Sequence, residues 1–230
     1  MREENGLTML APLSRVLSDH IANQVRGAII NDQLKPGQRI VEREIAEAME
    51  TSRGPVRDAL LLLEQEGLVV RYPHRGTFVT ELSLEDAEEI YTLRQAIEGL
   101  ALEYVLQRAT SEDLDGLDEQ VQEMAAEVEA GYDLGKATEL DLQFHRSLCR
   151  ISGHGRLLEA WEALSAQTRV LLLTHRRRNP RDFTERAVDW HRRLVQAIRL
   201  GDLDLARGEL CKHLAVTLEG FVNSSQESEL

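Results

Sequence analysis

Cysteine is scarce in this sequence, and long hydrophobic runs are absent from it. Of 230 residues only 2 are cysteine, Cys149 and Cys211. They stand far apart in apolar, helix-like surroundings, so we expect a reduced chain rather than a disulfide scaffold. No run approaches the roughly 18 apolar residues that would span a bilayer, and the residues after Met1 form no apolar signal core. These absences predict a protein of the cytoplasm without a membrane partner.

The chain also lacks a net positive charge, which would be the simplest sign of nucleic-acid binding. Its formal net charge is −13, but residues 1–80 contain 10 Lys and Arg against 11 Asp and Glu, whereas residues 81–230 contain 17 against 29. A nearly neutral part can still bind phosphates if its arginines share one face, while an acidic part is repelled by them. The length allows about two domains, and the charges favour a DNA reader followed by a separate sensor.

Residues 1–81 have the pattern of a winged helix-turn-helix domain. In chain order, the expected elements are a helix over residues 13–29, a short helix over 41–49, a helix over 52–66 and two strands over 68–72 and 77–80. The first helix rests on apolar residues at helical spacing, and the third on Thr51 or Ser52 as N-cap with Pro55 in the first turn. A turn ending in Gly76 joins the strands, so a hairpin closes the domain.

Residues 82–230 read almost entirely as helix. Ser83 offers an N-cap three residues before Asp86, and apolar residues then recur at helical spacing. The later helices are expected at about 111–130, 133–150, 155–177, 181–200 and 202–222, separated by Gly131, Gly153, Pro180 and Gly201. We therefore expect a mostly α protein whose second domain is an all-α bundle.

Two arginines near the start of the third predicted helix have the spacing of a DNA reader. Arg53 and Arg57 are four residues apart and share one helix face, and arginine can bond bidentately to guanine O6 and N7. Ser52 could bind phosphate or cap the helix, and Arg43 on the preceding helix could read a base or hold phosphate. The alternative is that these arginines are solvated charges paired with neighbouring acids.

The tip of the predicted hairpin carries a second basic feature. Arg75 would enter a groove or grip the backbone, and Gly76 would allow a close approach or a positive φ. The whole pattern resembles the GntR family of bacterial transcription regulators over residues 10–80. The resemblance rests on Glu42-Arg43-Glu44-Ile45-Ala46, Ser52-Arg53-x-Pro55-Val56-Arg57-x-Ala59-Leu60, Leu63-Glu64-x-Glu66-Gly67-Leu68 and Arg75-Gly76-Thr77-Phe78-Val79. It implies operator contacts from Arg43, Ser52, Arg53, Arg57, Arg75 and Gly76.

Three histidines and one aspartate form a candidate metal site in the second domain. Asp141 and His145 are four apart and so lie on one helix face, while His191 and His213 fall in the apolar rows of their helices. This donor set suits Zn²⁺, Ni²⁺, Mn²⁺, Fe²⁺ or Co²⁺ rather than calcium. The alternative is that they are hydrogen-bonded core residues. The other histidines, His20, His74, His154 and His175, read as surface residues.

Arg94 interrupts the apolar row of its helix, and a buried guanidinium needs a partner. Either it forms a structural ion pair with Glu98 or Asp141, or it clamps the carboxylate of a ligand.

Residues 84–222 resemble the all-helical FCD effector domain of the FadR subfamily, in its metal-containing branch. The resemblance rests on Leu93-Arg94-x-x-Ile97-Glu98, Asp141-x-x-Phe144-His145, His191-x-x-Leu194-x-x-Ala197-Ile198-x-x-Gly201-Asp202 and the late His213. It implies that Asp141, His145, His191 and His213 bind a metal, and that a small organic acid completes its shell, held also by Arg94.

The resulting expectation is a homodimeric repressor, not an enzyme, that binds a palindromic operator and releases it when the acid binds. Two alternatives stay open: a metal-dependent hydrolase with Glu98 or Glu139 as its only nearby acids, and a constitutive DNA-binding protein with a structural metal.

Overall fold

A computed structural model describes residues 13–178 and 186–226 of the chain. The chain divides into two compact units, Met1–Thr80 and Glu81–Leu230. Among the described residues, every helix is too short or too polar to cross a membrane.

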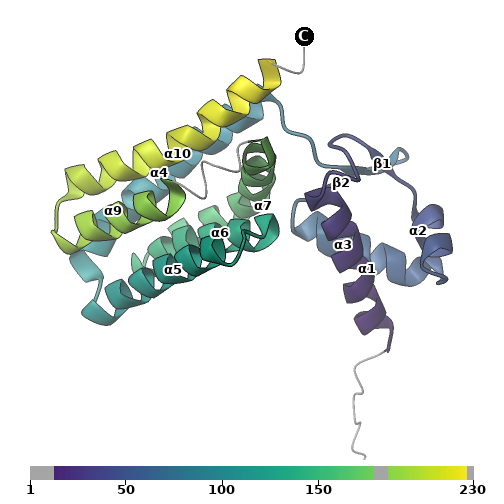
Figure 1. Ribbon diagram of the computed structural model, residues 1–230, viewed down its shortest axis with the longest axis horizontal. Helices are drawn as coiled ribbons and strands as arrows, with labels where there is room; N and C mark the ends of the chain where they lie inside the picture. Colours follow the sequence, from purple (N-terminus) through teal and green to yellow (C-terminus); the bar gives the residue numbers. More distant parts are fainter. Residues whose placement is uncertain (1–12, 179–185, 227–230) are drawn as a thin grey trace, which may run out of the picture. The chain divides into compact units, whose positions relative to one another are not determined.

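The first unit is a three-helix domain with a small sheet (Figure 1). Its elements are α1 (Leu13–Ile30), β1 (Arg39–Ile40), α2 (Glu42–Ala48), α3 (Arg53–Gln65), β2 (Val69–Tyr72) and β3 (Gly76–Val79). The predicted helices and hairpin agree with these bounds to within a few residues. Strand β1 was not predicted, because two residues are too few for a periodic pattern. It joins the hairpin to form an antiparallel sheet of order β1-β3-β2.

The core of the first unit lies between α1 and α3, which pack against each other. Ile21 on α1 and Val56, Leu60 and Leu63 on α3 are fully buried. Ser52 is the N-cap of α3 with an extended backbone, but its side chain makes no capping hydrogen bond. The packing therefore holds α3 by its apolar face and leaves the opposite face, with Arg53 and Arg57, exposed.

The second unit is an all-helical bundle. Its helices are α4 (Leu84–Arg108), α5 (Ser111–Glu129), α6 (Leu134–Ile151), α7 (Gly155–Arg178), α9 (Val188–Arg199) and α10 (Leu203–Gln226). The expected architecture, a mostly α protein with a winged helix-turn-helix followed by an all-α helical bundle, is confirmed. The predicted helix over 181–200 falls partly on residues 181–185, which lie outside the described residues, and α10 extends four residues beyond its predicted end.

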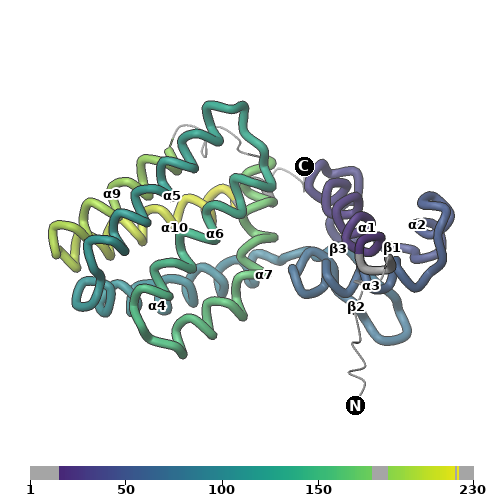
Figure 2. The backbone as a smooth tube through the Cα atoms, turned by 90° about the horizontal axis from the view of Figure 1, so that it is seen from below, coloured from purple at the N-terminus to yellow at the C-terminus, as the bar shows by residue number. Residues whose placement is uncertain are grey.

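The helices of the bundle pack as a ring in the order α5, α6, α7, α10, α9 and back to α5, and α4 packs against α6, α7, α9 and α10 (Figure 2). Two apolar clusters fill the interior, one around Phe144 and Leu148 and the other around Trp161 and Leu172. Ser83 and Asp86 form the predicted capping box at the start of α4. Because α6 faces both clusters, polar residues on its inner face are enclosed on all sides.

Candidate functional site

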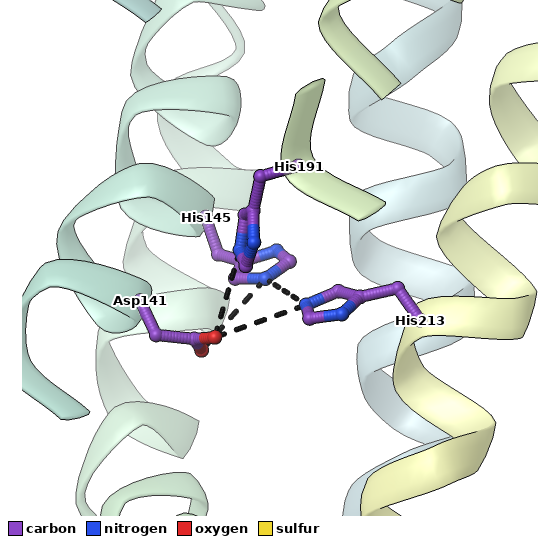
Figure 3. Close-up of side chains that lie close together, drawn as sticks. All are labelled: Asp141, His145, His191 and His213. Atoms are coloured by element: carbon purple, nitrogen blue, oxygen red, sulfur yellow. Dashed lines mark hydrogen bonds and ion pairs between the residues drawn. The ribbon is translucent and has the colours of Figure 1, made fainter. Parts of the chain in front are cut away.

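Four buried donor side chains from three helices converge inside the bundle. Asp141 and His145 come from α6, His191 from α9 and His213 from α10, and their donor atoms all lie within 4.8 Å of one another (Figure 3). Asp141, His145 and His191 are fully buried, and His213 is nearly so. The structure thus brings together all four residues that the sequence proposed as metal ligands.

Local sequence explains why each side chain points inward. Asp141 and His145 stand one turn apart on α6, where Leu148 continues the same buried face. His191 shares its buried row on α9 with Leu194 and Ile198. The apolar row therefore carries each donor into the core. Helices α9 and α10 pack against each other, and α4 packs against α6, α9 and α10; the donor atoms of the three rows meet there.

Outer hydrogen bonds orient two of the imidazole rings. His145 Nδ1 lies 2.6 Å from Glu98 Oε2, and His191 Nδ1 lies 2.6 Å from the backbone oxygen of Ala187. An ionised carboxylate or a carbonyl only accepts, so Nδ1 carries the proton in both rings and Nε2 presents a lone pair to the cluster. This arrangement, with the outer ring nitrogen fixed by an acceptor, is typical of histidines that bind metals.

The charges of the cluster favour metal-binding protonation states. Burial alone would raise the pKa of Asp141, but Arg176 and the surrounding imidazoles outweigh burial and hold it below its ordinary value. Arg176 Nη2 donates to Asp141 Oδ1 at 2.7 Å. Burial lowers the pKa of His191 to about 4 and that of His213 well below its ordinary value. An ionised carboxylate and neutral imidazoles are the forms that coordinate a cation.

Several buried polar atoms at the cluster have no hydrogen-bond partner among the described residues. They are Asp141 Oδ2, His191 Nε2, His213 Nδ1 and Arg94 Nη2. Such atoms are costly unless something satisfies them. His145 Nε2 and His213 Nε2 are 2.9 Å apart, a spacing that one shared proton or one shared ion can explain. The donor set and these unsatisfied atoms fit a transition metal, and the buried cluster could bind one.

Arg94 and Glu98 form one of the two ion pairs that the sequence left open. Arg94 Nε donates to Glu98 Oε1 at 2.8 Å, both side chains being buried, whereas Asp141 pairs with Arg176. Trp161 Nε1 also donates to Glu98 Oε1, at 3.1 Å. Burial alone would raise the pKa of Glu98, but Arg94 and His145 lower it to about 2. Glu98 therefore holds both Arg94 and His145, a role that spacing along α4 could not show.

The expectation that His175 is a surface residue was wrong. Its side chain is only 4% exposed, and Arg176 beside it is 3% exposed. The signal was present in the sequence, because His175 follows the buried Thr168 and Leu171 at helical spacing on α7. Both residues line a small pocket beside His213 and Trp190. The sequence reasoning thus missed Arg176, whose guanidinium donates to the Asp141 carboxylate.

The candidate DNA-contacting residues lie on the surface of the first unit, and two of them form ion pairs there. Arg57 Nε lies 2.8 Å from Glu42 Oε2, and Arg43 Nε lies 3.6 Å from Glu47 Oε1. Both arginines keep about 60% of their side chains exposed. In the absence of DNA, Arg43 and Arg57 thus match the alternative interpretation, in which solvated arginines pair with neighbouring acids.

The wing tip has the backbone that a close approach to a partner needs. Gly76 has φ of +109°, and Arg75 lies over the rings of Tyr72 and Phe78 at 5.3 and 6.0 Å. A groove of about 590 Å³ runs past this tip to the starts of α2 and α3, and its lining includes Arg43, Arg53, Arg75 and Gly76. Arg39 and Arg71 also line it, although the sequence analysis did not select them.

Comparison with known proteins assigns both units. Residues 17–79 match the bacterial regulatory proteins of the gntR family, and residues 89–216 match the FCD domain. The second match alone covers more than half of the chain. The chain belongs to the GntR family. The candidate DNA-contacting residues fall inside the first match of this GntR-family protein, and the Asp/His cluster falls inside the second.

Relatives of this GntR-family protein align with it over nearly their full lengths. It is 32% identical over 208 residues to an uncharacterised HTH-type transcriptional regulator, YdhC, of Bacillus subtilis, covering 86% of this chain and 90% of the relative. It is 31% identical over 223 residues to the "Probable D-xylose utilization operon transcriptional repressor" of Paenarthrobacter nicotinovorans, covering 94% and 96%. The solved E. coli McbR/YncC shares the fold, with a TM-score of 0.67, 23% identity and coverage of 92% and 98%. The matching families and relatives are transcription regulators and not enzymes, which removes the hydrolase alternative.

Proposed function

We propose that this GntR-family transcription regulator is a metal-dependent sensor of a small carboxylate. It binds a palindromic operator as a homodimer and releases the operator when the carboxylate binds. The observation that carries the proposal is the buried cluster of Asp141, His145, His191 and His213, with its unsatisfied donor and acceptor atoms. Because its target is DNA, the protein acts in the cytoplasm.

The four clustered side chains would hold a divalent transition metal such as Zn²⁺, Ni²⁺, Mn²⁺ or Fe²⁺. The metal would supply an electrophilic position at which a carboxylate oxygen can bind. Glu98 and the backbone oxygen of Ala187 hold the rings of His145 and His191 in place from outside. These two hydrogen bonds support the role of His145 and His191 as metal ligands.

The charge balance of the site supports an anionic effector. Four ionic side chains are buried there, Arg94 and Arg176 against Glu98 and Asp141. Their formal charges cancel, so a divalent cation would leave an uncompensated positive charge in a poorly solvated interior. An anion would offset it, and Arg94 Nη2, which has no partner among the described residues, is a buried donor that could bind one of its oxygens.

Helix α4 links the proposed effector site to a surface that suits a second copy of the chain. Its inner face carries Arg94 and Glu98, while Leu93, Ala96 and Leu100 are exposed at i, i+3 and i+7 on its outer face. An exposed apolar row of this spacing is a common helix-packing surface. An anion bound to Arg94 would act on the helix that carries this row, so the spacing of two DNA readers could depend on the effector.

Coupling of this kind requires that the effector bind the two arrangements with different affinities, typically by about 1 to 3 kcal/mol. In the DNA-bound dimer, Arg53 and Arg57 would read bases in adjacent major grooves, and Ser52 and Arg43 would hold phosphate or base edges. Arg75 and Gly76 would place the wing on the backbone or in the minor groove.

The test uses the full-length protein, the intergenic DNA beside its own gene, and metal analysis of the purified chain. We expect bound metal in the wild type and its loss in His191→Ala, while Arg57→Ala keeps the metal and loses operator binding. Candidate organic acids should then weaken operator binding by the metal-loaded wild type. Tighter binding in their presence would overturn the proposed sign. If neither metal nor any of the acids changed operator binding, the result would support a constitutive DNA-binding protein instead.

A further inference from the structure

The arginines of the DNA-binding unit whose side chains the structure describes fall into two groups. Four are ion-paired: Arg26 with Glu66, Arg43 with Glu47, Arg57 with Glu42 and Arg71 with Glu64. Arg39, Arg53 and Arg75 have no ion pair with any acid in the described part of this unit. An arginine without an acidic partner can bind a phosphate without first breaking an ion pair.

The three unpaired arginines line the same groove. Arg39 enters it from β1, Arg53 from the first residue of α3 and Arg75 from the turn between β2 and β3. Three neighbouring positive charges without counter-charges of their own repel one another, and a polyanion would relieve that repulsion. Two acids, Glu42 and Glu64, also line the groove, but they pair with Arg57 and Arg71. The charges of the three unpaired arginines are therefore left for an anion.

Arg39 is the least expected member of this group, since it lies on the short strand that sequence patterns did not predict. Strand β1 pairs with β3 so that Arg39 stands opposite Phe78. Its guanidinium lies against the wing tip, because a Cβ added to Gly76 would come within 3.3 Å of Arg39 Nε. The Arg39 side chain is exposed, and Arg75 directly precedes Gly76 in the sequence.

We propose that Arg39 contacts a DNA phosphate directly, and that Arg39, Arg53 and Arg75 form the unpaired arginine strip that first engages the duplex. Arg39 holds backbone rather than reading a base, because it extends from the sheet beside the wing and not from the start of the recognition helix. Arg43 and Arg57 bind the DNA afterwards, once their ion pairs with Glu47 and Glu42 have been broken. The inference rests on the DNA-binding role of the GntR domain and on no property of the metal cluster.

The experiment measures binding of the full-length protein to a mixed-sequence DNA duplex by fluorescence anisotropy, between about 50 and 200 mM KCl. A mixed sequence suffices because a phosphate contact is independent of base sequence. Each lost phosphate contact should reduce the slope of log Kobs against log [KCl] by about 0.9. Arg39→Gln is therefore expected to reduce the slope by about 1 per DNA-binding unit, and Arg39→Lys, which keeps the charge, to retain it.

Lys35→Gln is the matched control. Lys35 is an exposed cation of the same unit that pairs with Asp32 and does not line the groove. Its substitution removes the same charge and is expected to leave the slope unchanged. Equal slopes for Arg39→Gln and the wild type, or equal losses in Arg39→Gln and Lys35→Gln, would overturn the proposal. If the wild type failed to bind any duplex, the DNA-binding role itself would be wrong, which is a separate result. Arg39 is exposed and unpaired, so the melting temperature of Arg39→Gln should match that of the wild type and show that the fold is intact.

Discussion

The Glu98 carboxylate joins Arg94 and His145, two residues that are 51 positions apart in the sequence and lie on different helices. Its Oε2 accepts from His145 Nδ1 at 2.6 Å, and its Oε1 accepts from Arg94 Nε at 2.8 Å.

 Arg94 belongs to α4 and His145 to α6, so one carboxylate fixes a candidate effector-binding cation and a candidate metal ligand at the same time. A change at either one should therefore be felt at the other.

Glu98→Gln should weaken metal binding by about 10 to 100-fold, the usual cost of removing the outer hydrogen bond of a ligating histidine. The amide oxygen of the variant can still accept the hydrogen bond from His145 Nδ1. Because the amide has no negative charge, His145 becomes a weaker metal ligand. Isothermal titration of metal into the metal-free protein would measure the change. Glu103→Gln on the same helix, where Glu103 pairs with Arg207 at the surface, is the control. An unchanged metal affinity in Glu98→Gln would contradict the positioning role.

Removal of the metal should lower the melting temperature of the full chain. An ion that binds only the folded state stabilises it by about 4 kcal/mol when its concentration is 1,000 times its Kd. His191→Ala should melt at the same temperature with and without a chelator, whereas His20→Ala, at an exposed histidine outside the cluster, should behave like the wild type. A wild-type melting curve that neither a chelator nor added metal can shift would argue against a metal at this cluster.

The pair formed by Asp141 and Arg176 should matter for stability even without metal. Both side chains are buried, and Asp141→Ala removes the carboxylate that lies 2.7 Å from Arg176 Nη2. Breaking such a pair typically costs about 3 to 5 kcal/mol. In chelator, urea unfolding of Asp141→Ala, Arg176→Ala and the double variant should show that the two losses do not add. Strict additivity would mean that the two groups do not depend on each other.

Glu42→Gln should strengthen binding to a mixed-sequence duplex and make it more sensitive to salt. The substitution frees Arg57 from its ion pair at 2.8 Å and removes a negative charge near the DNA-facing surface. Glu44→Gln is the matched control, because Glu44 is an exposed acid in the same first turn of α2. A gain of the same size in both variants would show that net charge, and not the release of Arg57, is responsible.

Local patterns were enough to predict the elements and much of the candidate metal site. Helical spacing placed Asp141 and His145 on one face and turned His191 inward, because the period of a helix decides which side chains share a face. The same reasoning should have found His175, which follows Leu171 in a buried row. Strand β1 escaped it, since two residues acquire their strand character only by pairing with β3.

By itself, the sequence determined the two-part architecture, the inward rows of the bundle and the positions of the arginines, all of which follow from short-range periodicity and charge. Only the tertiary structure decided which groups meet: Glu98 with His145, Arg176 with Asp141, and Glu42 with Arg57. Ion pairs and hydrogen bonds of this kind depend on distances between different helices, and packing sets those distances. The unpaired arginine strip could likewise be recognised only from the tertiary structure, which shows which acids lie near each arginine.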